Sequence, residues 1–162
     1  MAGPYGRLPC RNGWLIMCLR VDDIIHPGRW PDCKVTKKNL LVFKGLSVDT
    51  RSKGITYSSP YRGTEYVMGN MNHADLFSDT CGNYYGEIHH GIHSCLSRAA
   101  AKEHSSRVFP AIIPAGSKIW YGKGYRDVAS DKLIVFRDMR DLNRHYDVSE
   151  PQTLSQLIRS IR

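Results

Sequence analysis

The run Glu87–Cys95 holds the densest group of side chains that could do chemistry, because it carries three histidines and one cysteine within nine residues. Imidazole nitrogens and thiolate sulfur are ligands that Zn²⁺ favours. If the run forms a strand, His89 and His93 share one face and could bind one ion. Further imidazoles and thiols flank the run at His73, Cys81 and His104. Neither H-E-x-x-H nor C-x-x-C is present, so we predict hydrogen-bonded histidines and no metal site, with His89 and His93 as the alternative metal ligands.

Cys95 is the residue in this run that could act as a nucleophile. It precedes a segment that we expect to be helical, and the positive end of a helix dipole lowers the pKa of a nearby thiol. A buried cysteine at a strand-to-helix junction is, however, common packing. The chain contains no G-x-x-x-x-G-K-[ST], G-x-G-x-x-G or G-x-S-x-G motif, which removes the commonest nucleotide-binding and hydrolase signatures. The residues themselves therefore predict no catalytic residue and no cofactor.

Short strands must position these side chains, because apolar runs bounded by Gly, Pro, Asn or Asp recur along the chain. The predicted strands are Trp14–Val21, Asn39–Val48, Thr64–Met68, Arg107–Ile113, Lys118–Tyr121 and Lys132–Phe136. No repeat or long linker divides the sequence, so we predict one domain over residues 1–162. Residues 1–12, which are rich in Gly and Pro, are predicted to form an irregular arm.

Two helices are predicted beside the strands. Leu96–Ser106 contains good helix formers after a possible N-cap at Ser94 or Ser97. In residues 149–162, Ser149 and Gln152 form a capping box before an amphipathic pattern of leucine and isoleucine. The predicted fold class is α+β: a compact, mostly antiparallel sheet of short strands with one internal helix and a C-terminal amphipathic helix.

The formal net charge of +8 is concentrated in the first 62 residues, which carry 11 Lys/Arg against 4 Asp/Glu, whereas the rest carries 12 against 11. Such a segment attracts nucleic acid or an acidic protein face, and the attraction weakens with salt. The predicted binding residues are Arg7, Arg11, Arg29, Lys34, Lys37 and Lys38. The alternative is that these charges bind no partner and only keep the surface soluble, because they are scattered along the sequence. The apolar stretch Trp14–Leu19 is far too short to cross a bilayer, so no membrane span is predicted.

Four segments form an ordered series: Gly63-Thr64-Glu65-Tyr66, Gly91-Ile92-His93, Ile113-Pro114-Ala115-Gly116-Ser117-Lys118 and Ser130-Asp131-Lys132-Leu133-Ile134. Taken in order, they resemble a family of small uncharacterised proteins from bacteriophages and large DNA viruses. They match the family pattern G-T-E-Y, G-[FI]-H, I-P-x-G-S-K and S-D-K-[LI]-[IV], within a core of residues 40–136. The resemblance implies a viral source and no particular activity.

A more distant likeness is to the ADP-ribosyltransferase fold, in which a strand ending in Gly and an aromatic residue precedes an Ala-containing helix. Here Gly91-Ile92-His93 and the alanines after Arg98 correspond to that arrangement. The likeness implies a catalytic set of His89, His93 and Asp131 acting on a nicotinamide nucleotide. Asp131 stands where the fold carries a catalytic Glu, and fold-level likeness alone supports no activity.

These observations lead us to expect a non-enzymatic viral protein, a minor capsid-associated component that binds neighbouring capsid subunits. One alternative is an ADP-ribosyltransferase-like enzyme, and the other is an accessory binder of nucleic acid or host protein through the basic N-terminal third. The expected location is the virion, or the host cytoplasm during infection. Five cysteines, an odd number without close pairs, suit free thiols in a reducing compartment.

Overall fold

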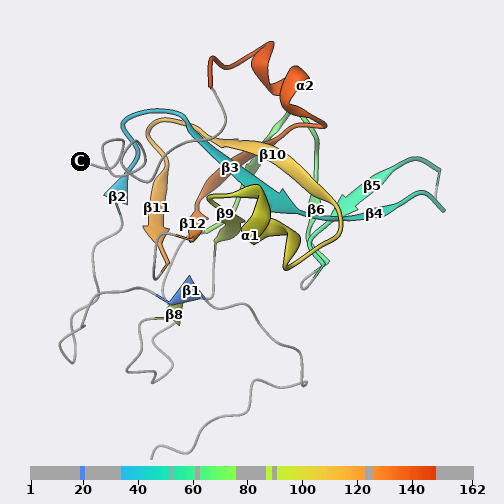
Figure 1. Cartoon of the computed structure of the whole chain (residues 1–162), viewed down its shortest axis with the longest axis horizontal. Helices are drawn as coiled ribbons and strands as arrows, with labels where there is room; N and C mark the ends of the chain where they lie inside the picture. The colour runs from blue at the N-terminus through green and yellow to red at the C-terminus, as the bar shows by residue number, and fades with distance from the viewer. Residues whose placement is uncertain are drawn as a thin grey trace, which may run out of the picture.

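An eight-stranded antiparallel sheet dominates the computed structural model, which describes residues 19–20, 34–51, 53–60, 63–75, 87–88, 91–122 and 126–148 (Figure 1). The strands, in spatial order, are β2 (Lys34–Val35), β11 (Lys118–Tyr121), β12 (Asp127–Ser130), β9 (Ile92–Cys95), β3 (Leu40–Gly45), β10 (Val108–Ile113), β13 (Lys132–Val135) and β7 (Met71–His73). Every pairing within it is antiparallel.

Two smaller sheets accompany the main one. A three-stranded sheet consists of β4 (Ser47–Asp49), β5 (Thr56–Ser58) and β6 (Glu65–Tyr66), and a two-stranded pair consists of β1 (Leu19–Arg20) and β8 (Glu87–Ile88). The hairpin of β4 and β5 extends away from the main sheet, and the pair of β1 and β8 lies below the main sheet in this view, near β12 (Figure 1).

The two helices are short. They are α1 (Arg98–Lys102) and α2 (Met139–Asn143). The side chain of Ser97 caps α1 by accepting a hydrogen bond from the backbone N–H of Ala100 at 3.1 Å. None of the helices within the described ranges is long and apolar enough to cross a membrane.

Strand β3 shows why both faces of the main sheet are buried. Leu40 and Val42 point into one core cluster, whereas Leu41 and Phe43 point into another, and none of the four is more than 3% exposed. A continuous apolar run is what a strand needs when both of its faces meet a core. The central position of β3 therefore follows directly from the Leu-Leu-Val-Phe run.

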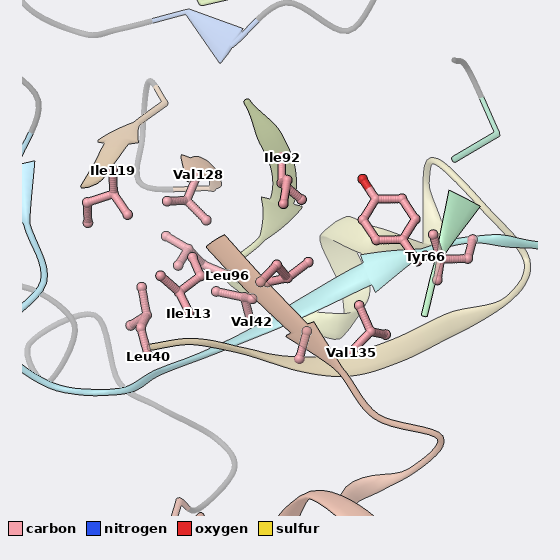
Figure 2. Close-up of a cluster of buried hydrophobic side chains, with 12 residues drawn as sticks. Leu40, Val42, Tyr66, Ile92, Leu96, Ile113, Ile119, Val128 and Val135 are labelled. Atoms are coloured by element: carbon pink, nitrogen blue, oxygen red, sulfur yellow. The ribbon is translucent and has the colours of Figure 1, made fainter. Parts of the chain in front are cut away.

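The first core cluster, seen in Figure 2, gathers side chains from the main sheet and from β6. Its members are Leu40, Val42, Leu46, Tyr66, Ile92, Leu96, Ala111, Ile113, Ile119, Val128, Leu133 and Val135. The second core cluster lies under the two helices. Its members are Leu41, Phe43, Cys95, Ala100, Ala101, Ile112, Ile134, Phe136 and Leu142. The helices thus serve as covers for one face of the sheet.

The predicted α+β fold class is wrong: the described chain is mostly antiparallel β with two short helices. The internal helix predicted over Leu96–Ser106 is shorter than expected: α1 covers five residues, because Ser97 caps its start and the side chain of Ser105 bonds to the chain outside the helix. Ser105 Oγ donates a hydrogen bond to the Leu46 carbonyl at 3.2 Å and accepts one from the Arg107 N–H at 3.2 Å. The predicted C-terminal helix at 149–162 and the arm at 1–12 lie outside the described residues.

Candidate functional site

A cysteine, a histidine and an aspartate meet where the end of α1 approaches β9 and β12. One ligand atom each from Cys95, His104 and Asp127 lies within 4.8 Å of the others, a group that stands out among the described side chains. Cys95 ends β9 and Asp127 begins β12, and the two residues are direct partners in the antiparallel register. Paired residues point to the same face of a sheet, so pairing alone brings the thiol and the carboxylate together.

His104 follows the C-terminal end of α1, which places its imidazole near Cys95 and Asp127. The cap at Ser97 fixes the start of the helix, and buried Ala100 and Ala101 seat it on the second core cluster. The backbone N–H of His104 then donates to the Ala101 carbonyl at 3.1 Å, which ties the histidine to the helix end. The position of His104 is therefore set by helix capping and by alanine packing.

The thiol is buried, whereas the other two side chains reach the surface. Cys95 is 5% exposed, and His104 and Asp127 are partly exposed. The Cys95 thiol donates a hydrogen bond from Sγ to Asp127 Oδ1, with 3.4 Å between the atoms. The group thus lies at the boundary between the core and solvent.

Burial raises the pKa of the Cys95 thiol to about 12, and the negative charge and hydrogen bond of Asp127 act in the same direction. Lys44 and Arg126 oppose the shift. The thiolate is the nucleophilic form of cysteine, so a protonated, buried thiol is inert. The raised pKa speaks against the alternative of a thiol activated by the helix dipole, because desolvation by burial is the largest cause of the shift.

The nearby cations are already engaged. Arg126 forms an ion pair with Glu103 beside the cluster. Lys44 is buried in β3, where its Nζ donates to the His93 carbonyl and lies 5.2 Å from the centre of the Tyr66 ring.

The two described members of the implied catalytic set, His93 and Asp131, make contacts that hold the sheet together. His93 lies on β9 opposite Ala129, and its carbonyl is the acceptor for Lys44. Asp131 follows β12 in a tight turn, where its Oδ1 accepts from the Lys118 N–H at 2.9 Å and its own N–H donates to the Lys118 carbonyl at 3.1 Å. This carboxylate therefore ties the bend after β12 to the start of β11. His89, the third member, lies outside the described residues.

Three of the six predicted binding residues lie at one edge of the main sheet. Lys34 belongs to the edge strand β2, Lys37 and Lys38 follow in the next bend, and all three are exposed. Lys118, which the sequence reasoning omitted, joins them from β11 because it pairs with Val35. The other predicted residues, Arg7, Arg11 and Arg29, lie outside the described residues.

The sequence reasoning did not find the cluster of Cys95, His104 and Asp127. His104 was noted only as a neighbour of the histidine run, and Asp127 was not considered. No local signal identifies Asp127, because its contact with Cys95 depends on the pairing of β9 with β12, 32 residues apart. No protein-family model, curated protein or solved structure matches this chain.

Proposed function

We propose that this chain is a non-enzymatic viral protein, a minor capsid-associated component that binds acidic faces of neighbouring subunits through the β2 edge of its main sheet. The viral assignment rests on the four resembling segments. The observation that carries the binding role is the exposed group of lysines at this edge, to which β11 contributes Lys118 from far along the chain. We name this surface, made of Lys34, Val35, Lys37, Lys38 and Lys118, the basic edge.

The basic edge is held firmly by a buried threonine. Thr36 is 6% exposed, and its Oγ1 donates to the Pro114 carbonyl at 2.8 Å. Its backbone N–H donates to the Ser117 carbonyl at 2.9 Å, and its carbonyl accepts from the Gly116 N–H at 2.7 Å. A preorganised surface loses less conformational entropy on binding, which favours a stable contact.

The chemistry of the basic edge favours a protein partner over nucleic acid. Val35, the direct strand partner of Lys118, is 55% exposed, and apolar exposure of this kind suits contact with a protein surface. Among the strands of the described residues, β2 ends the spatial order of the sheet, and an edge strand of this kind can pair with an extended segment of a partner. Lysines on such an edge repel a second basic edge and attract acidic residues.

The candidate site gives no support to catalysis. Burial raises the pKa of the Cys95 thiol to about 12, and the carboxylate of Asp131 accepts a hydrogen bond from the start of β11. An enzyme would need an activated nucleophile or a free acid or base in a cleft. The carboxylate of Asp131, a described member of the implied set, is instead used in holding the sheet together, which favours the binding role. The corresponding location is the virion, or the host cytoplasm before assembly.

A charge-reversal experiment in infected cells tests this proposal. The wild-type chain is compared with the variant Lys37→Glu/Lys38→Glu and with a matched control, Lys53→Glu/Arg137→Glu, whose positions are exposed elsewhere. Particles are purified, the amount of the chain in them is measured, and lysine-reactive cross-links from Lys34 are identified by mass spectrometry. Lys34 is unchanged in all three proteins, so it reports on the same surface.

We expect cross-links from Lys34 to capsid subunits, and we expect both these links and the copy number per particle to fall in the first variant alone. Raised salt should weaken the association because exposed charges are screened. Equal incorporation of all three proteins would refute the role of the basic edge. Links to host proteins only would refute the capsid partner, and release by nuclease would indicate nucleic acid instead.

A further inference from the structure

The cluster of Cys95, His104 and Asp127 carries an inference that is independent of the proposed binding role. It presents one sulfur, one imidazole nitrogen and one carboxylate oxygen from three different elements. These are the three donor types that bind Zn²⁺ in proteins. Magnesium and calcium prefer oxygen ligands alone, so a thiol and an imidazole favour a softer transition-metal ion.

The spacing of the ligand atoms fits one ion. Zinc–ligand bonds of about 2.0–2.3 Å in a tetrahedron place neighbouring ligand atoms roughly 3.4–3.6 Å apart. Cys95 Sγ and Asp127 Oδ1 are already 3.4 Å apart, and His104 completes a group in which no two ligand atoms are more than 4.8 Å apart. A movement of about 1 Å, within the reach of side-chain rotation on a partly exposed histidine, brings the third ligand to bonding distance.

The charges of the cluster also suit a dication. A thiolate and a carboxylate neutralise the two positive charges of Zn²⁺, and a neutral imidazole adds none. Of the two cations nearest the thiol, Arg126 pairs with Glu103 and Lys44 binds the carbonyl of His93. A neutral metal complex is therefore compatible with a partly buried position.

We propose that Cys95, His104 and Asp127 bind one Zn²⁺ ion that joins the end of α1 to β9 and β12. On binding, Sγ–H releases its proton to solvent and the sulfur lone pair forms the bond to the metal. The imidazole donates a nitrogen lone pair, and the carboxylate donates from one oxygen. Because His104 and Asp127 reach the surface, the fourth position faces solvent, where a water completes the tetrahedron.

Cobalt binding to a single-thiol chain tests the proposal. The full chain is prepared with Cys10, Cys18, Cys33 and Cys81 replaced by serine, so that Cys95 is the remaining thiol. Metal-free, reduced protein is titrated with Co²⁺, which takes the place of Zn²⁺ and reports its ligands by absorption. We expect one Co²⁺ per chain, a thiolate-to-cobalt charge-transfer band in the near ultraviolet, and intense visible bands of tetrahedral cobalt. Added Zn²⁺ should abolish these bands.

Substitutions identify the ligands. His104→Gln and Asp127→Asn should each weaken Co²⁺ binding by at least about tenfold, because even residues that only orient ligands contribute that much. Cys95→Ser should abolish the charge-transfer band. The control His73→Gln changes an exposed imidazole on β7, at the far edge of the sheet, and should leave binding unchanged. Circular dichroism of each metal-free variant checks that it is folded.

A titration without the charge-transfer band, or equal Co²⁺ affinity in the three ligand variants and the control, would overturn the proposal. If the four-serine chain does not fold, native mass spectrometry of the zinc-loaded wild-type chain decides instead. In that measurement His104→Gln should retain one zinc ion fewer than the wild type. An unchanged zinc count would refute the site.

Discussion

Gly45 lies at the closest approach between the main sheet and the segment after α1, and replacing it tests the packing that positions His104. A Cβ at Gly45 would stand 2.8 Å from Ser105 Cβ and 3.4 Å from the Ala101 carbonyl oxygen. Carbon atoms pack best at about 3.5–4.0 Å, so Gly45→Ala creates an overlap of about 1 Å. Ser105 is held in place by its hydrogen bond to the Leu46 carbonyl, so it cannot simply move aside.

The size of the effect follows from two opposing contributions. Overpacking of this kind costs about 1–3 kcal/mol. Replacing glycine by alanine recovers about 0.4–1 kcal/mol, because the unfolded chain loses freedom. We expect Gly45→Ala to lower the free energy of unfolding by about 1–2 kcal/mol, which for a chain of this length lowers Tm by roughly 2–8 °C.

Thermal and urea unfolding followed by circular dichroism measure the change, and a second site isolates its cause. Ser105→Gly removes the Cβ that Gly45→Ala would contact. The loss of unfolding free energy in the double variant should therefore be about 1 kcal/mol smaller than the sum of the losses in the two single variants. Ser105→Ala is the matched control, because it keeps the Cβ and removes only the hydroxyl. A Gly45→Ala protein as stable as the wild type would refute this account of the packing. So would a coupling free energy between Gly45→Ala and Ser105→Gly that equals the one between Gly45→Ala and Ser105→Ala.

Two further predictions concern the thiol and the second helix. In the metal-free single-thiol chain, alkylation of Cys95 by iodoacetamide at about pH 8 should be about 1000-fold slower than in denaturant, because a pKa of about 12 against the ordinary 9.0 leaves that much less thiolate. Its rate should keep rising tenfold per pH unit to about pH 10, whereas a plateau near pH 9 would contradict the raised pKa. Asp138 caps α2 by accepting from the Asp141 N–H at 2.7 Å, so Asp138→Ala should cost about 1 kcal/mol and lower Tm by roughly 2–4 °C, with Asp138→Asn nearly neutral. An unchanged Tm in the alanine variant would show that this cap does not stabilise α2.

Strands with strong apolar patterns could be predicted from the sequence. The predicted strand Lys118–Tyr121 coincides with β11, and Arg107–Ile113 differs from β10 by one residue. The predicted strand Asn39–Val48 is interrupted at Leu46, where the chain passes from the main sheet to β4. Such a break depends on which strand pairs with which, and apolar patterning does not encode it.

Strands and helices with weak patterns were missed. Strand β12, Asp-Val-Ala-Ser, contains residues typical of turns, and only its place between β9 and β11 makes it a strand. Helix α2 is too short for a helical period to show, and its stability depends on the cap at Asp138 and on Leu142, which is fully buried. In both cases tertiary context overrides local propensity.

Asp127 gives the strongest reason to regard the cluster at the end of α1 as more than packing. The fold needs only a residue that pairs with Cys95 at the start of β12, and a valine or threonine would suit a strand better. An aspartate there is partly withdrawn from water and accepts a hydrogen bond from a thiol, which is a weak donor. The carboxylate also disfavours ionisation of Cys95, whereas the charges of Lys44 and Arg126 favour it. A metal ion reverses that balance, because the same two groups then become its anionic ligands. Residues that disfavour their own secondary structure tend to occur at functional sites. At position 127 an aspartate disfavours the strand but can bind a metal ion.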